Sequence, residues 1–466
     1  MIHSPDSHSA PDSVPESVPD STQKTAPKII VLDDDPTGSQ TVHSCPLLLR
    51  WDPETLRQGL QDPSPILFIL TNTRSLPPAQ AETVTRDVCR HLKQAIAPLD
   101  NPDILLVSRS DSTLRGHYPL ESDTIAEELG PFDAQFLVPA FIEGGRITRH
   151  STHFVITVIT PNGDRPVPET IPVHETEFAR DPAFPFHHSF LPAYVEEKTQ
   201  GKVLADQVDR IQLEDLRGDR PQLIQRLLNY RNNQIVTVDG ETQQDLDNFA
   251  SALKATSGKK YLFRSAASLL TSLAALPPQA IAPEAMGQYR RSDRPGIIIV
   301  GSHVQTTTHQ LNHLLEQPEA IALEIPIPQL TDTTLPHHID TLQHQLHHHW
   351  HQGKTPVLYT SRTFHPNVPA PRITQLVTQL ISALVRTLPP ATSYIISKGG
   401  ITTNNLLSNS LNLTTVQLLG QILPGISVVT TPTDHPQLPN LPIVTFPGNV
   451  GAPNALTEVH RRLRYS

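Results

Sequence analysis

The chain reads Lys28-Ile29-Ile30-Val31-Leu32-Asp33-Asp34-Asp35-Pro36-Thr37-Gly38 where its first apolar segment meets a polar loop. A strand buried on both faces of a parallel sheet has such a continuous apolar run. The following Asp, Pro, Thr and Gly suit a turn, and ligands of parallel sheets bind beyond the carboxyl ends of the strands. The stretch therefore predicts a buried strand over 29–32 and, directly after it, a loop in which a binding site is to be sought.

The same succession of apolar run, polar loop and helix-like segment recurs along the chain. Further strands are expected over 66–70, 104–107, 136–138 and 235–238, and again over 297–300, 356–359, 394–396 and 443–446. Helices are expected between them, for example over 79–97 and 221–229. This alternation is typical of α/β proteins. We predict two α/β domains, each with a mostly parallel sheet flanked by helices, and an active site in the cleft between the domains.

Shifts in composition set the predicted boundaries. Residues 1–27 are rich in Ser, Pro, Asp and Glu and lack the apolar block of a secretory signal, so we expect a disordered N-terminal tail. A loose stretch over 277–295 separates the two series of strands. We therefore predict a substrate-binding domain over 28–276, a linker over 277–295 and a nucleotide-binding domain over 296–466.

The overall composition argues against several classes of protein. The 466 residues carry a formal net charge of −10 and no basic stripe, which argues against a nucleic-acid binder. Two cysteines, Cys45 and Cys89, provide neither a disulfide framework nor a thiolate metal cluster and favour a reducing compartment. No run approaches the roughly 18 apolar residues of a membrane span. We expect a cytoplasmic protein with no nucleic-acid or membrane partner, and a homo-oligomer is compatible with the sequence.

The loops after the predicted strands differ between the two halves. In the first half they carry Asp and Arg, which suit a charged, polyhydroxylated small molecule. In the second half they carry Gly, Ser and Thr, whose backbone and hydroxyl donors suit phosphates. No Gly-x4-Gly-Lys-Ser/Thr sequence occurs, so a P-loop is excluded. The division predicts a substrate side and a nucleotide side.

Eight of these loop segments, taken in order, resemble the motifs of the four-carbon acid sugar kinase family. The segments lie at 34–38, 71–75, 110–116, 139–146 and 175–182 in the first half, and at 301–303, 397–402 and 446–451 in the second. The resemblance extends from Lys28 to the end of the chain. It implies ATP-dependent phosphorylation of a terminal hydroxyl on a four-carbon sugar acid such as threonate, erythronate or a keto derivative.

The resemblance also implies roles for individual residues. It places Asp34, Asp35, Asp111, Arg74 and Arg115 on the substrate side. An acidic residue near the acceptor hydroxyl can orient it and take its proton, so the three carboxylates are the catalytic candidates. Arg74 and Arg115 can each grip a substrate carboxylate, and Arg109 and Arg146 are further substrate-binding candidates. The resemblance places six residues at the nucleotide: Ser302, Gly399, Gly400, Ile401, Thr402 and Gly448. The chemistry of ATP leads us to expect Mg²⁺, but its protein ligands are not identifiable from the sequence.

Each assignment has a structural alternative. Asp-Pro-Thr-Gly suits a plain turn, the arginines suit salt bridges, and Arg109 and Arg146 suit packing roles as well as phosphate or substrate contacts. Lys398 could reach a phosphate or remain solvated. Asn404-Asn405 and the segment 452–454 depart from the family pattern and leave nucleotide use open.

The spacing of a histidine-rich segment would allow a metal site on a helix. Its composition is better explained by a solvated amphipathic helix, so we predict no metal site there. The histidines concerned are His337, His338, His344, His347, His348, His349 and His351.

Two other functions remain open. One is a catalytically idle protein that binds or senses a sugar acid. The other is a kinase that uses a longer hydroxy acid or a donor other than ATP.

Overall fold

The computed structural model describes residues 27–99, 102–159, 167–363 and 368–464. The predicted tail over 1–27 lies outside these residues except for its last position. Among the described residues, no helix has the length and apolar character required to cross a membrane.

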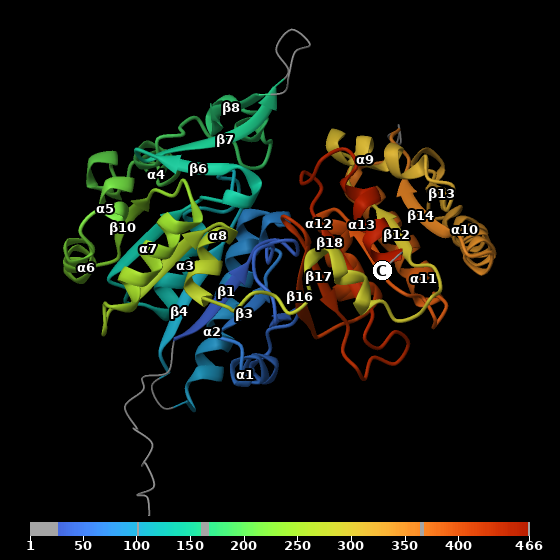
Figure 1. The fold of residues 1–466 in the computed structure, drawn as a ribbon, viewed down its shortest axis with the longest axis horizontal. Coiled ribbons are helices and arrows are strands. Elements are labelled where there is room, and N and C mark those ends of the chain that lie inside the picture. The colour runs from blue at the N-terminus through green and yellow to red at the C-terminus, as the bar shows by residue number, and fades with distance from the viewer. Residues whose placement is uncertain (1–26, 100–101, 160–166, 364–367, 465–466) are drawn as a thin grey trace, which may run out of the picture.

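The N-terminal half contains a mostly parallel sheet with helices on both faces (Figure 1). Its strands are β1 (Lys28–Asp33), β2 (Cys45–Leu48), β3 (Ile66–Leu70), β4 (Ile104–Arg109), β5 (Ala134–Val138), β9 (Asp209–Ile211), β10 (Gln234–Val238) and β11 (Tyr261–Ser265). Its helices are α1 (Pro53–Gln61), α2 (Pro78–Ile96), α3 (Leu120–Leu129), α4 (Leu191–Lys198), α5 (Leu213–Arg217), α6 (Arg220–Asn229), α7 (Gln243–Lys254) and α8 (Ala267–Ala274). A separate antiparallel sheet consists of β6 (Arg146–Arg149), β7 (Thr152–Ile159) and β8 (Val167–Pro172).

The C-terminal half repeats this arrangement. Its strands are β12 (Ile297–Val300), β13 (Ala320–Ile325), β14 (Thr355–Thr360), β15 (Ile395–Lys398), β16 (Thr415–Leu423), β17 (Ile426–Thr430) and β18 (Pro442–Phe446). Its helices are α9 (Gln305–Leu315), α10 (Leu335–His351), α11 (Ala370–Arg386), α12 (Gly400–Asn404) and α13 (Ala455–Arg464). The predicted fold class, a mostly parallel α/β protein in two halves, is confirmed.

The two predicted sheets join into one. The sheet has 15 strands in the order β13-β14-β12-β15-β18-β17-β16-β2-β3-β1-β4-β11-β5-β10-β9. The junction is an antiparallel pairing of β2 with β16, in which Cys45 faces Leu418 and Leu47 faces Val416. Pairing satisfies the backbone groups that an edge strand would leave open on each side. No pattern in the sequence predicted this junction.

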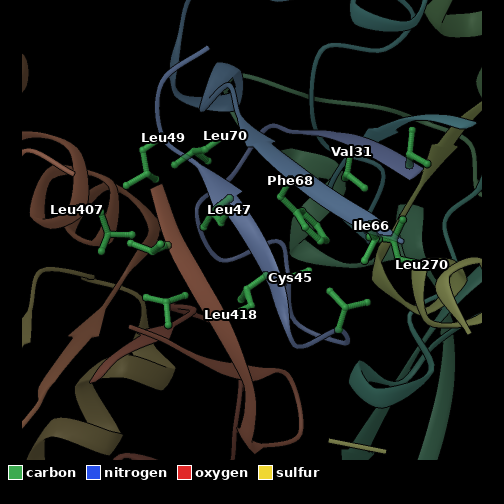
Figure 2. Packing of buried hydrophobic residues seen from close by; sticks show 14 of the residues in the cluster. Val31, Cys45, Leu47, Leu49, Ile66, Phe68, Leu70, Leu270, Leu407 and Leu418 are labelled. Atoms are coloured by element: carbon green, nitrogen blue, oxygen red, sulfur yellow. The ribbon is translucent and has the colours of Figure 1, made fainter. Parts of the chain in front are cut away.

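The hydrophobic core also crosses the junction. Figure 2 shows Cys45 and Leu47 of β2 beside Leu418 of β16, and all three belong to one cluster of buried residues. Their exposed fractions are between 0 and 1%. The two halves therefore share one core, which fixes the loops at the ends of β1 and β15 relative to each other.

The predicted helices form because their apolar residues recur at helical spacing. On α2, Ala81, Thr85, Val88, Cys89 and Leu92 are buried while the intervening positions contact solvent. The histidine-rich segment is likewise the amphipathic helix α10, which buries Leu342, Leu346 and Trp350.

Candidate active site

A cavity of about 870 Å³ lies between the two halves at the carboxyl ends of the parallel strands. This is the location that the sequence predicts, and the volume is in the range of small-molecule sites. Ten of the predicted site residues line it: Asp34, Asp35, Arg74, Arg109, Asp111, Arg115, Arg146, Gly400, Ile401 and Gly448. Ser302, Gly399 and Thr402 do not line it and lie behind the residues that do.

The loop after β1 is a tight turn, and the same turn carries part of the site. The Gly38 amide donates to the Asp35 carbonyl over 2.9 Å, and the Thr37 amide donates to the Asp35 carboxylate over 2.7 Å. A Cβ at Gly38 would lie 2.1 Å from Oδ1 of Asp33, so a larger residue would collide with that buried carboxylate. The turn directs Asp34 and Asp35 into the cavity.

Arg74 lies among three carboxylates. It follows β3 in a short 3-10 helix, η1 (Thr73–Ser75). Its Nη2 is 2.5 Å from Oδ1 of Asp34 and its Nε is 3.1 Å from Oδ2, a bidentate pairing. Its Nη1 is 3.3 Å from Asp35 and 3.7 Å from Asp111. Arg74 thus joins the loops after β1, β3 and β4.

Burial and the arginines affect the neighbouring carboxylates differently. Burial raises the pKa of Asp33 to about 7, although Arg109 pulls it down. Burial also raises the pKa of Asp34, and Arg74 offsets only part of that effect. At Asp35 burial again opposes ionisation, but Arg74 and Arg109 outweigh it and lower the pKa. Of these three side chains, Asp35 therefore holds its negative charge most firmly.

Arg109 ends β4 and lies beneath the cluster. Its Nη1 is 3.3 Å from Asp33 and 3.7 Å from Asp34, and its side chain is 5% exposed. Its guanidinium supports the Asp33–Asp35 loop and also reaches the cavity wall. The geometry is compatible with both roles that the sequence left open for Arg109, a packing role and a contact to phosphate or substrate.

Asp111 and Arg115 form a second ion pair at the cavity. The Arg115 Nε donates to Asp111 over 2.9 Å, and its Nη1 lies 3.3 Å from Asp181. Although burial opposes ionisation of Asp111, Arg115 and Arg74 hold the pKa of this carboxyl well below its usual range. The guanidinium of Arg115 also lies 5.1 Å from the centre of the Phe178 ring.

Arg146 differs from the other predicted arginines. It begins β6 and lines the cavity, and its Nη1 donates to the Gly144 carbonyl. Within the described residues it forms no ion pair, and its buried Nε has no hydrogen-bond partner. Burial lowers its pKa.

A buried ion pair supports these loops from below. Arg264 of β11 donates to Glu121 of α3 over 2.5 Å and to Ser108 over 2.7 Å. Glu121 also accepts a hydrogen bond from Thr73, next to Arg74. Both charged side chains are at most 5% exposed.

On the opposite side of the cavity, three loops converge at Ser302. A Cβ at Gly448 would lie 2.6 Å from the Ser302 Oγ, and one at Gly399 would lie 3.1 Å from the Ser302 Cβ. Gly399 has a φ of +114°, which favours glycine. The buried amide of Gln310 donates to the carbonyls of the adjoining loop at 450–452 over 2.9–3.1 Å. These contacts hold the loops after β12, β15 and β18 close together on this side of the cavity.

Lys398 is neither solvated nor at the cavity wall, so neither sequence interpretation of this residue describes it. It is fully buried, and its Nζ donates to the Pro447 carbonyl over 2.8 Å. The Nζ also lies 3.7 Å from the centre of the Phe446 ring. Burial lowers the pKa of Lys398 to about 6. The amine therefore ties the end of β15 to the loop after β18.

Several residues that line the cavity had no role predicted from the sequence. The loop around a short 3-10 helix, η5 (Glu177–Arg180), contributes Phe178, Arg180 and Asp181. The family motif at 175–182 marked this loop, but nothing in its composition indicated ion pairing with Arg115. Val304 and Val450 add apolar surface on the other side.

Comparisons with known proteins agree with this division of the molecule into two halves. Residues 29–273 match the model of a sugar-binding N-terminal domain, and residues 297–456 match that of a nucleotide-binding C-terminal domain. The fold and site thus define a protein with paired sugar-binding and nucleotide-binding domains. The chain belongs to the four-carbon acid sugar kinase family.

Two curated relatives are similar over part of their length. The chain is 27% identical to D-erythronate kinase of Heliobacterium modesticaldum over 230 residues, which are 48% of this chain and 47% of that protein. It is 30% identical to D-threonate kinase of Bordetella bronchiseptica over 174 residues, 36% of this chain and 38% of that protein. The matched stretches therefore span less than half of either relative.

Two crystal structures share the fold. One, described as a putative tRNA synthase from Salmonella typhimurium LT2, has a TM-score of 0.67 at 18% identity and covers 93% of this chain and 98% of its own. A Haemophilus influenzae protein has a TM-score of 0.62 at 15% identity, covering 93% of this chain and 100% of its own. These likenesses concern the fold alone.

Proposed function

We propose that the protein is a kinase that transfers phosphate from ATP to a terminal hydroxyl of a four-carbon sugar acid. We further propose that residues 28–276 bind the acid and residues 296–466 bind the nucleotide, with 277–295 as the linker. The proposal rests on one observation: Asp35 of the acidic loop lies next to Gly400 of the glycine loop. A Cβ at Gly400 would lie 3.1 Å from Oδ2 of Asp35, so the acidic cluster meets the glycine loop across the cavity.

In this reaction Asp35 orients the acceptor hydroxyl and takes its proton. Its lowered pKa keeps it ionised, and the oxygen that Thr37 does not engage lies toward the glycine loop. A strongly basic group is not required, because phosphoryl transfer depends mainly on positioning and charge stabilisation. Arg74 is a positioning residue that holds Asp34 and Asp35 in place.

On the nucleotide side, Gly400, Ile401 and Gly448 contact ATP. Gly400 and Gly448 bring backbone to the cavity without side chains between it and a phosphate, and α12 begins at Gly400. Ser302, Gly399 and Thr402 pack behind them and fix their positions. Gly448 in particular has no space for a side chain, because the Ser302 side chain packs next to it.

The residues at the cavity fit Mg²⁺ that enters with the nucleotide. The described residues contain no group of three or more His, Cys, Asp or Glu placed to hold a metal ion. Mg²⁺ typically binds through one or two carboxylates together with substrate phosphates and water. The ion would be held mainly by the nucleotide phosphates and water, and it would neutralise phosphate charge.

A coupled ADP-release assay tests the proposal. ATP and Mg²⁺ are supplied with D- and L-threonate, D- and L-erythronate and their keto forms, and ordinary sugars are included for comparison. Release with one or two of the acids, and none with the sugars, supports the proposal. ATP binding without release across the panel would contradict the choice of acceptor. Absence of both would favour a binding protein.

Asp35→Asn tests the proposed catalytic role. Turnover should fall by at least roughly 100-fold, the scale of general acid–base catalysis, while ATP binding persists. Asp209→Asn is the control, because Asp209 also pairs with an arginine, Arg226, but lies outside the cavity. Wild-type turnover by Asp35→Asn would exclude the assignment.

A further inference from the structure

The arginines that line the cavity differ in their counter-charges. Arg74, Arg109 and Arg115 each lie within 3.3 Å of at least one aspartate oxygen. Arg146 faces no carboxylate within hydrogen-bonding distance among the described residues, although Asp111 and Arg115 are its charged neighbours. The protein thus provides counter-ions for three of the five cavity arginines and leaves Arg146 and Arg180 without one among the described residues.

The residues around Arg146 fix its guanidinium without supplying a counter-ion. Its Nη1 is fixed by the Gly144 carbonyl, and a Cβ at Gly144 would lie 2.7 Å from that nitrogen, so the glycine makes room for the guanidinium. The opposite edge, formed by Nε and Nη2, makes no hydrogen bond within the described chain, and Nε is buried. Nη2, the nitrogen of this edge that is not buried, is the donor left for a ligand carboxylate.

Arg146 is half-buried, and a cation at such a position without a counter-charge is costly; an anionic ligand removes part of that cost. Burial, together with the charge of Arg115, lowers the pKa of Arg146. Arg180 also lines the cavity and forms no ion pair in the described part of the chain, but its side chain is exposed. Arg146 is therefore the cavity arginine for which a ligand anion matters most.

We propose that Arg146 binds the carboxylate of the acid and is the residue that selects a sugar acid over the corresponding neutral polyol. The proposal rests on the proposed kinase function for its substrate class. It also orients the substrate: with the carboxylate at Arg146 and the acceptor at Asp35, the hydroxyl at the far end of the carbon chain receives the phosphate. Arg74 and Arg115, the other arginines suggested for the substrate side, are paired with aspartates in this structure.

Calorimetric binding by the full-length protein tests the inference. D-erythronate and D-threonate are compared with erythritol and D-threitol, for wild type, Arg146→Met and Arg146→Lys. Losing hydrogen bonds to a charged group should weaken acid binding by roughly 10- to 150-fold in Arg146→Met. Polyol affinity should change little, and Arg146→Lys should recover part of the loss. KM for ATP should stay the same.

Arg149→Met is the matched control. Arg149 lies on the same strand, β6, but pairs with Glu241 and is absent from the cavity wall. It should retain the wild-type preference for acids. If wild type phosphorylates an acid and Arg146→Met keeps both acid affinity and preference, only the role of Arg146 is overturned. If wild type neither binds nor phosphorylates any of the four-carbon acids, the proposed function fails together with this inference.

Discussion

Replacing Lys398 with Met should stabilise the protein near neutral pH, and the gain should shrink as pH rises. Burial lowers the pKa of Lys398 from 10.5 to about 6, so folding at intermediate pH requires the ammonium to release its proton. The native state then binds fewer protons than the unfolded state, and stability rises with pH over this window. Met carries no proton and removes this dependence.

The size of the effect follows from the pKa difference. At pH 7.5 the deprotonation costs about 4 kcal/mol, at 1.36 kcal/mol for each pH unit below the unfolded value. The substitution also removes the hydrogen bond to the Pro447 carbonyl and leaves that oxygen unpaired, which costs about 1–3 kcal/mol. Lys398→Met should therefore raise the free energy of unfolding by roughly 1–3 kcal/mol at pH 7.5. The gain should fall by about 1.4 kcal/mol per pH unit up to pH 10.

Urea denaturation of wild type and variant at pH 6.5, 7.5, 8.5 and 9.5 measures this slope. Lys354→Met is the control, because the Lys354 amine also donates to a proline carbonyl, that of Pro318, but at the surface over 2.9 Å. This variant measures the loss of a comparable hydrogen bond at an exposed position. A stability difference between Lys398→Met and wild type that does not vary with pH would refute the reasoning.

Three further predictions concern the frame of the site. Arg264→Met leaves the Glu121 carboxylate charged and buried without its partner, so it should lower the free energy of unfolding by about 3–5 kcal/mol. The loss should appear as a lower midpoint in urea denaturation. A change below about 1 kcal/mol would contradict a supporting role for this ion pair. Gly301→Ala places a Cβ 1.9 Å from the Thr402 Oγ and should cost about 1–3 kcal/mol, which Gly301→Ala/Thr402→Ala should largely restore in the same measurement. Burial raises the pKa of Asp33 from 3.8 to about 7, so wild type loses stability as pH rises through this window. Asp33→Asn should gain about 1.4 kcal/mol per pH unit relative to wild type between pH 5 and 7 in urea titrations, and a flat difference would exclude this.

Much of the fold was predictable because its parallel strands are buried on both faces. The apolar run after Lys28 forms β1, and every other strand that the sequence predicts is present within one or two residues at most ends. The junction was not predictable in the same way. β2 has four residues, one of them a proline, and β16 alternates between buried and partly buried positions along its length. Their partners lie more than 360 residues apart, and no local pattern indicates such a pairing.

The candidate site was predictable in its members but not in their partnerships. The sequence identified Arg74, Arg115 and Arg146 as cavity residues, yet residue type alone cannot show which guanidinium meets a carboxylate. The pairing depends on how the loops that follow separate strands come together at one edge of the sheet. Lys398 shows the same limit, since its burial follows from its position at the end of a central strand rather than from its neighbours in the sequence.

The pairing of β2 with β16 has a consequence for dividing the gene. A chain cut within 277–295 would give two fragments, each presenting one strand of the broken ladder with its apolar residues uncovered, Cys45 and Leu47 on one fragment and Leu418 on the other. Either fragment produced alone would tend to aggregate through that strand. Produced together, each fragment carries the strand that covers the other, which makes this position suited to a split-protein reporter whose reassembly restores the cavity.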